Sequence, residues 1–137
     1  MKIVIEPGGV LPVRANPTDA GLDLRAPVQI EVPANLRRSV VDTKIRAEIP
    51  EGHVGILLPK SGLMKNNGIL SFGVIDAGYT GTIKAVLINT GAETAVFNPG
   101  EKVTQMVIVP CVTPEIEIAD ELGKTQRGDR GFGSTGR

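Results

Sequence analysis

The sequence predicts an all-β protein, because short runs of β-branched residues alternate with turn signals along almost the whole chain. Seventeen glycines and ten prolines are spread among the 137 residues, and neither residue favours the interior of a helix. The runs between them are rich in valine and isoleucine and have the length of strands. This regular punctuation is typical of an antiparallel sandwich or barrel.

Eight runs are predicted to be strands. They are residues 2–6, 28–32, 38–49, 54–58, 69–75, 82–89, 102–110 and 115–118. The last of them reads Glu-Ile-Glu-Ile and alternates with period two, as a half-buried strand does. Only residues 61–67 favour a helix, with Ser61 as the expected N-cap and Asn67-Gly68 as the expected end.

Composition bounds the kind of protein. A chain of 137 residues with 41% hydrophobic and 22% charged residues suits one soluble domain. The formal net charge is zero, so no overall field attracts nucleic acid or an anionic membrane. The first residues do not form a signal peptide or a membrane span. The single cysteine, Cys111, excludes an intramolecular disulfide and is expected to be a buried thiol in a reducing compartment.

The C-terminal residues depart from this pattern. Residues 123–137 are rich in glycine, cationic, and contain Phe132 but no aliphatic side chain. Such a segment cannot build a core. We therefore expect a β domain over residues 1–122 and a C-terminal arm over residues 123–137, ordered only by a partner.

Residues 73–81 are expected to form the tip of a β-hairpin, because they lie between two apolar runs and include three glycines. Asp76 and the only tyrosine, Tyr79, are the bulky polar residues of this tip. For one isolated hairpin, ordinary turn chemistry explains these residues as well as a functional site does.

Polar side chains at four other places are candidates for a site. Asp23 lies in an apolar stretch, Lys60 and Ser61 lie at a strand-to-helix junction, and Gln105 lies within a predicted strand. Free amides at a helix start favour an anion. Residues 127–136 add guanidinium groups, hydroxyl groups and unhindered amides, which suit phosphate.

Several reaction types are excluded by what the sequence lacks. There is no cysteine–histidine cluster with zinc spacing and no Walker-type loop. The single histidine, His53, is expected in an exposed turn, and no nucleophile elbow is present, which argues against a Ser/His/Asp hydrolase.

Taken together, five segments in this order resemble the motifs of the trimeric dUTPase family over essentially the whole chain. They are residues 20–24, 59–63, 73–81, 103–110 and 127–136. The resemblance implies a distorted jelly roll, the hydrolysis of dUTP to dUMP and pyrophosphate with Mg²⁺, and a homotrimer whose shared active sites are closed by the C-terminal arms. It also implies that the protein limits uracil incorporation into DNA, supplies dUMP for thymidylate synthesis, and works in the cytoplasm or inside a host cell.

The resemblance also implies a role for each motif residue. Asp76 would orient or deprotonate the attacking water, and Tyr79 would exclude a ribose 2′-hydroxyl. Asp23 would hold water ligands of the magnesium ion. The other residues implied to contact the substrate are Lys60, Ser61, Gly62, Gly73, Val74, Ile75, Lys84, Gln105, Arg127, Phe132, Gly133, Ser134 and Thr135.

The chain departs from the common family pattern at three places. Lys60 stands where arginine is usual, so a planar guanidinium group that can bind phosphate through two nitrogens is replaced by a single ammonium charge. Leu22 replaces a frequent aromatic residue, and residues 128–130 replace a more glycine-rich run. Two alternatives remain at this point: a relative of the dCTP deaminases, which share the fold, and a nucleotide-gated regulatory binding protein.

Overall fold

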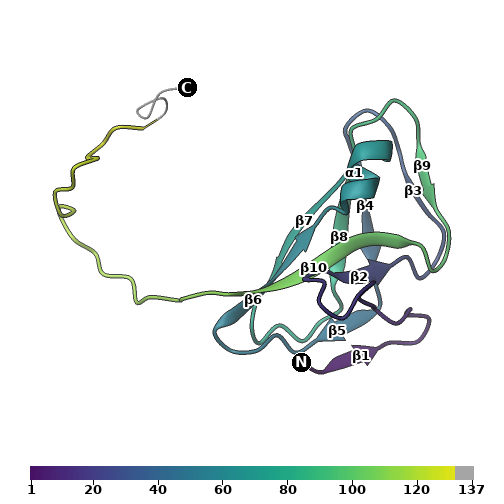
Figure 1. Ribbon diagram of the computed structural model, residues 1–137, viewed down its shortest axis with the longest axis horizontal. Coiled ribbons are helices and arrows are strands. Elements are labelled where there is room, and N and C mark those ends of the chain that lie inside the picture. Colours follow the sequence, from purple (N-terminus) through teal and green to yellow (C-terminus); the bar gives the residue numbers. More distant parts are fainter. Residues whose placement is uncertain (132–137) are drawn as a thin grey trace.

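The computed structural model describes residues 1–131 and confirms an all-β fold with one short helix (Figure 1). Phe132, Gly133, Ser134 and Thr135, which the sequence assigns to the substrate site, lie outside the described residues. Within the described part, no helix is long and apolar enough to cross a membrane.

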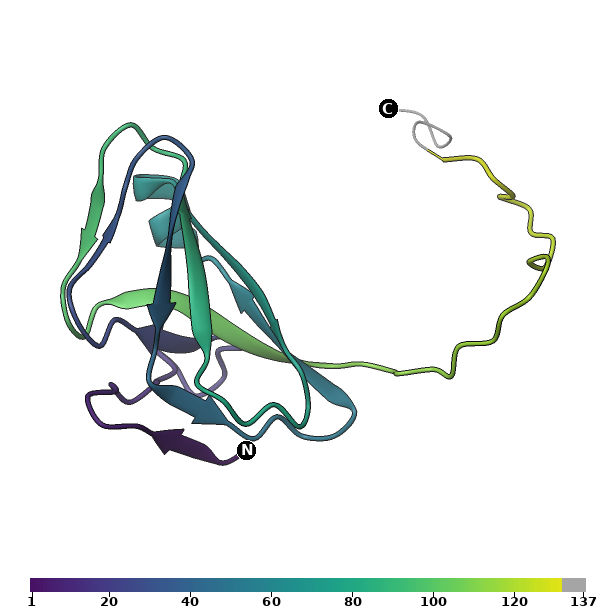
Figure 2. The ribbon, with the colours of Figure 1, turned by 180° about the vertical axis from the view of Figure 1, so that it is seen from behind.

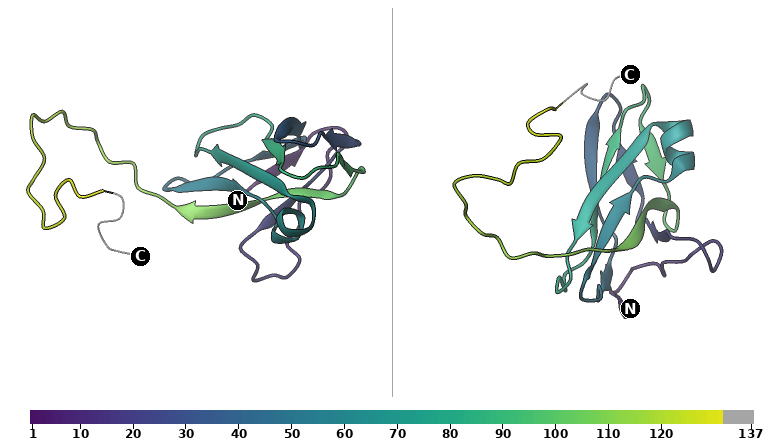
Figure 3. Two further views of the ribbon diagram at one scale, coloured as in Figure 1. Left: turned by 90° about the horizontal axis from the view of Figure 1, so that it is seen from above. Right: turned by 60° about the vertical axis from the view of Figure 1, so that its left-hand side comes forward.

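Six antiparallel strands form the main sheet. Its order is β2 (Leu22–Arg25), β10 (Lys102–Pro110), β6 (His53–Leu58), β7 (Ile69–Ile75), β8 (Lys84–Asn89) and β4 (Arg37–Asp42). Two small antiparallel sheets complete the fold: β1 (Ile3–Ile5) with β5 (Ile45–Ala47), and β3 (Ile30–Val32) with β9 (Ala95–Phe97). The curled sheets enclose one core, and α1 (Ser61–Asn67) lies beside β7 at one end (Figure 3).

The core is made by alternate residues of the central strands. Leu57 of β6, Leu87 of β8 and Met106 of β10 are fully buried, with Leu24 of β2 beside them. A side chain on Gly73 would lie 3.0 Å from Leu57 Cδ1, so a larger residue there would press against the fully buried Leu57. The core therefore fixes the strands that carry the predicted site residues.

The predicted strand at residues 38–49 is two strands. β4 ends at Asp42 and β5 begins at Ile45. Between them Lys44 has φ of 59° and donates its backbone N–H to Asp42 Oδ1 at 3.0 Å. The chain turns here with a lysine in the left-handed region, which few non-glycine residues adopt. No glycine or proline marks this turn in the sequence.

Other expectations are also corrected. Residues 115–118 form no strand, because Ile116 and Ile118 have no partner and are 94% and 97% exposed. Strands β2 and β9 were not predicted.

Lys60, not Ser61, is the N-cap residue of α1, and no side chain caps it. Gly68, with φ of 65°, ends the helix as predicted. His53 begins β6 and is half-buried, as is Cys111.

The chain leaves the sheet after Pro110 at the end of β10. Residues 112–131 are exposed throughout and carry no strand or helix. Figure 2 shows this segment running away from the domain as a wide arc that does not touch the sheets. The arc makes no contribution to the core in this single chain.

Candidate functional site

Asp23 is the most constrained polar residue of the predicted site. Its side chain is only 4% exposed, and each carboxylate oxygen is bonded to a different lysine. Lys60 Nζ lies 2.5 Å from Oδ1, and Lys102 Nζ lies 2.7 Å from Oδ2. These contacts join β2 to the start of α1 and to β10.

The two lysines decide the protonation state of Asp23. Burial raises the pKa of this carboxyl group, but hydrogen bonds from Lys102 and Lys60, together with their charges, outweigh burial and hold the pKa below 3.8. Asp23 is therefore an anion at neutral pH. With one carboxylate between two ammonium groups, the cluster has a net positive charge, which suits a polyanionic ligand.

Lys102 is a residue that sequence reasoning missed, and a β-bulge explains its position. In β10, Gln105 pairs with Asp23 and Thr104 with Leu24, but Lys102 pairs with Arg25 because the register shifts between Lys102 and Thr104. A bulge re-aims the side chain before it, and here it turns Lys102 to the face of β2 that carries Asp23. A charged residue at the start of an apolar strand was the available signal, but it does not reveal a bulge.

A hollow of about 360 Å³ opens beside Asp23 and is also lined by two other predicted site residues, Lys60 and Gln105. Gln105 Nε2 donates to the Pro59 carbonyl at 3.1 Å. A side chain on Gly21 would lie 2.1 Å from Gln105 Oε1, so glycine there gives Gln105 its space. Ser61 and Gly62 follow Lys60 directly and are exposed. The structure thus brings Asp23, Lys60 and Gln105 together.

The hairpin between β7 and β8 opens before its tip. The pairs between these strands run from Ile69–Asn89 to Phe72–Val86. Gly73, Val74 and Ile75 pair only with β6, on the other side of β7. Their backbone groups on the side of β8 therefore have no strand partner. Lys84 begins β8 across this opening and is exposed. An unpaired strand edge of this kind offers donors and acceptors in a fixed order.

The tip itself is a tight turn with a fixed tyrosine. Tyr79 N–H donates to the Asp76 carbonyl at 3.2 Å, and Gly78 between them has φ of 89°, as the third residue of a type II turn requires. Tyr79 Oη donates to the Thr82 carbonyl at 3.0 Å. A side chain on Gly81 would lie 2.5 Å from Tyr79 Oη. The ring can lie over the turn only because residue 81 is glycine, and Asp76 faces solvent.

The two groups of residues lie far apart within one chain. Asp23 and Ile75 are three strands apart in the sheet, and their partners on β6, Leu58 and Gly55, are offset by three residues along that strand. With strand spacings of about 4.8 Å and a rise of about 3.3 Å per residue, the separation is roughly 17 Å. The hairpin tip and the Asp23 cluster therefore do not form one compact pocket in a single subunit.

Arg127 is not brought to either group. Arg127 Nε donates to the Arg130 carbonyl at 3.1 Å, and Arg130 Nε donates back to the Arg127 carbonyl at 3.0 Å. Both residues are exposed and belong to the arc that follows β10.

The donor set tests whether magnesium fits. Among residues 1–131, no group of three or more histidine, cysteine or acidic side chains is placed to hold a metal ion. The oxygens of Asp23 suit a hard cation, but Lys60 and Lys102 repel a free one. Asp23 therefore fits contact through water with a metal ion that a triphosphate brings in, because the phosphate charge offsets the repulsion.

Comparisons with known proteins agree with this geometry. A family model described as dUTPase matches residues 9–136. The deoxyuridine 5′-triphosphate nucleotidohydrolase of Hydrogenobaculum is 42% identical over 129 residues, covering 92% of this chain and 90% of the relative. The enzyme of the same name from Chlamydia pneumoniae is 41% identical over 139 residues, covering 96% and 94%.

Solved structures give the same result. The dUTPase of Staphylococcus bacteriophage 80alpha, determined with dUPNHPP, superposes with a TM-score of 0.89 at 26% identity, over 99% of this chain and 98% of that one. A phage phi11 dUTPase variant, described with a structural Mg(II) ion, superposes with a TM-score of 0.79 at 25% identity, over 90% and 98%. With the motifs, the fold and the relatives in agreement, the chain belongs to the dUTPase family of deoxyuridine 5′-triphosphate nucleotidohydrolases.

Proposed function

We propose that this chain performs the hydrolysis of dUTP by water attack on the α-phosphorus, releasing dUMP and pyrophosphate. The observation that carries this proposal is the unpaired edge of β7 at residues 73–75, which ends in the turn that holds Asp76 and Tyr79. The edge selects the nucleoside, and the turn beside it carries the groups that act on the sugar and on water.

Uracil binds to the backbone of Gly73, Val74 and Ile75 in this proposal. A fixed order of backbone donors and acceptors rejects cytosine, because the wrong base leaves buried polar groups unpaired. Tyr79, held by its bond to Thr82, lies under the sugar and excludes a 2′-hydroxyl. Lys84 lies across the opening and supplies a positive charge beside the nucleotide.

Asp76 is proposed to be the catalytic base that orients and deprotonates the attacking water. A carboxylate can accept a proton from water and can orient the water by a hydrogen bond. The side chain is exposed at the tip, so it reaches a bound nucleotide without any change in the fold. Catalysis then consists mainly of positioning and of neutralising phosphate charge.

The triphosphate is proposed to bind at the positive cluster around Asp23. Lys60, Ser61, Gly62 and Gln105 contact phosphate oxygens, and Lys60 turns from Asp23 towards phosphate while Lys102 keeps Asp23 in place. Asp23 would hold water ligands of a Mg²⁺ ion carried by the triphosphate, and that ion would neutralise phosphate charge. The hollow lined by Asp23, Lys60 and Gln105 supports this assignment.

We propose that the protein is a homotrimer with active sites between subunits. The roughly 17 Å between hairpin tip and Asp23 cluster within one chain favours a site built from the hairpin of one subunit and the cluster of another. The outer face of the main sheet is apolar: Phe72 and Val40 both pair with Val86 of β8 and are 57% and 59% exposed, and Val74 is 65% exposed. Apolar side chains gathered on one face favour burial by another subunit.

The C-terminal arm is proposed to close each site. Arg127 contacts the γ-phosphate, Phe132 stacks on uracil, and Gly133, Ser134 and Thr135 cover the phosphates. The residues before them are exposed and free of the sheet, so they can extend to a neighbouring subunit. The proposed role is to limit uracil in DNA and to supply dUMP for thymidylate synthesis, in the cytoplasm or inside a host cell, where nucleoside triphosphates are found.

The substrate range tests the proposed function. Release of pyrophosphate is expected to be fast with dUTP and slow with dTTP, dCTP and UTP, because of the fitted base edge and Tyr79. Removing Mg²⁺ with EDTA is expected to lower the rate with dUTP by about 100-fold or more. Release of ammonia from dCTP would identify a deaminase instead, and tight binding of dUTP without turnover would identify a regulatory binding protein.

Replacing the proposed base separates binding from chemistry. Asp76→Asn is expected to lower kcat by about 100-fold or more, with little change in the affinity for a non-hydrolysable dUTP analogue or in the melting temperature. Glu31→Gln is a control, because Glu31 of β3 is an exposed carboxylate that lines neither the hollow beside Asp23 nor the hairpin tip. Near-normal kcat in Asp76→Asn would contradict the proposed role.

Lys102 is expected to position Asp23. In Lys102→Gln, Lys60 is the remaining partner of Asp23. Because Lys60 then stays paired with Asp23, it is not available to phosphate, and kcat/KM for dUTP is expected to fall about tenfold or more. The basis is that losing one partner of a buried charge pair costs about 2–5 kcal/mol. Lys102→Arg keeps the charge and is expected to restore most of the activity. Equal losses in both variants would show a packing role only.

Deletion of residues 127–137 tests the arm. Because residues 112–131 do not pack on the domain, the melting temperature is expected to stay nearly unchanged, while activity falls by about 100-fold or more through loss of phosphate contacts. Arg127→Ala is expected to reproduce part of this loss, with Arg130→Ala as the matched control. A collapse of the melting temperature on deletion would show that the arm belongs to the core.

A further inference from the structure

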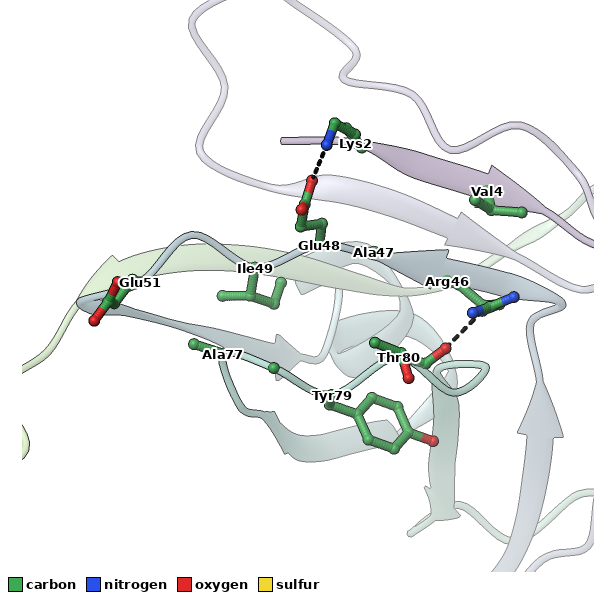
Figure 4. Close-up of a pocket in the computed structure, with 11 residues that line it drawn as sticks. Lys2, Val4, Arg46, Ala47, Glu48, Ile49, Glu51, Ala77, Tyr79 and Thr80 are labelled. Carbon is green, nitrogen blue, oxygen red and sulfur yellow. Dashed lines mark hydrogen bonds and ion pairs between the residues drawn. The ribbon is translucent and has the colours of Figure 1, made fainter.

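A second hollow, of about 620 Å³, lies between the small β1–β5 sheet and the hairpin tip (Figure 4). Its floor on one side is formed by Ala77, Gly78, Tyr79 and Thr80 of the tip. On the other side the chain from Arg46 to Ile49 and residues of β1 close it. The hollow separates the tip from the N-terminal sheet, and only one side chain drawn in Figure 4 is bonded across it.

That side chain is Arg46 of β5. Arg46 Nε donates to the Thr80 carbonyl at 2.6 Å, and Arg46 Nη1 donates to Glu6 Oε1 at 3.2 Å. Glu6 is itself held next to β5, because its N–H donates to the Lys44 carbonyl at 2.8 Å. A planar guanidinium serves two acceptors at once without losing much freedom, and hydrogen bonds from a charged donor are stronger than neutral ones.

The rest of the tip is held by local bonds. The Asp76–Tyr79 turn and the bond from Tyr79 Oη to Thr82 both lie within the tip itself. The tip joins the domain at its base, where the Ile83 N–H donates to the Ile45 carbonyl at 2.7 Å. Residues 76–80 are exposed. The Arg46 contact is therefore placed to fix the outer part of the turn, beyond the base.

We propose that Arg46, oriented by Glu6, is a positioning residue that holds the turn at residues 76–80 in its binding conformation. This inference rests on the proposed roles of Asp76 and Tyr79, because Arg46 touches neither the base nor the phosphates and acts through the Thr80 carbonyl. It links the N-terminal strand β1 to the sugar-binding side of the active site. Selection of the sugar thus depends on a contact with a sheet that carries no motif residue.

Arg46→Ala is expected to loosen the turn. Small displacements of groups at a reacting centre cost up to about 100-fold in rate, so kcat/KM for dUTP is expected to fall about tenfold. UTP is expected to be affected less, because Tyr79 no longer excludes the 2′-hydroxyl as strictly. The ratio of kcat/KM for dUTP to that for UTP therefore falls, and a purely structural loss of active protein would leave this ratio unchanged.

Three further variants sharpen the test. Arg46→Lys keeps a single donor and is expected to restore part of the ratio, and Glu6→Gln, which removes only the orienting charge, is expected to show a smaller loss. Lys2→Ala is the matched control, because Lys2 lines the same hollow and pairs only with Glu48 at 3.2 Å. An unchanged dUTP-to-UTP ratio in Arg46→Ala, Arg46→Lys and Glu6→Gln would overturn the inference.

The test also separates this inference from the proposed function. If Asp76→Asn is inactive while Arg46→Ala has normal activity and a normal ratio, only the role of Arg46 fails. If Asp76→Asn is fully active, the proposed role of Asp76 fails, whereas a lower dUTP-to-UTP ratio in Arg46→Ala would still show that Arg46 positions Tyr79. A lower ratio in Arg46→Ala together with an inactive Asp76→Asn supports both.

Discussion

The contact on which the site depends is the buried carboxylate of Asp23 between Lys60 and Lys102. A buried carboxylate without partners costs several kcal/mol, whereas two ammonium groups at hydrogen-bonding distance keep it ionised. The three residues come from β2, the start of α1 and β10, so the pairing also fixes how these elements meet. The net positive charge of this cluster supports the proposed binding of a triphosphate beside it and disfavours the binding of a free metal ion.

The hairpin contributes a different kind of specificity. β7 pairs with β8 from Ile69 to Phe72, and its last three residues, 73–75, pair only with β6. On the side of β8, residues 73–75 therefore form a short strand edge without a partner, and proteins normally cover such an edge. Here a ligand is proposed to take the place of the missing strand. In this proposal a base is recognised at an interruption of the sheet.

Much of the architecture could be predicted from the sequence. The long central strands and the helix at residues 61–67 follow from β-branched runs and from Asn67-Gly68. β2 and β9 were missed because each has three or four residues and only its pairing partner makes it a strand. Residues 115–118 show the reverse case: a regular alternating pattern forms no strand because no strand among residues 1–131 pairs with it. The turn at Lys44 was missed because its conformation is imposed by β4 and β5 on either side of it.

The site was predictable to the extent that its residues lie in recognisable motifs. Asp23, Lys60 and Gln105 were found from the sequence, and the structure brings them together around one hollow. Lys102 was not found, because a β-bulge in β10 decides the direction of its side chain. Arg46 was not found either, because it reaches the hairpin tip only through the backbone carbonyl of Thr80, and the sequence does not reveal contacts with a backbone carbonyl.

The exposed arc after Pro110 has a consequence for the energetics of the catalytic cycle. Ordering one residue costs about 1–2 kcal/mol of backbone conformational entropy, and residues 112–131 are exposed and do not pack against the rest of the described structure to offset such a cost. In the proposed closed state, contacts with the nucleotide and with neighbouring subunits have to supply this free energy. The net free energy of dUTP binding is then the free energy of these contacts minus the cost of ordering the segment. The conformational entropy that the segment regains on opening favours release of the products.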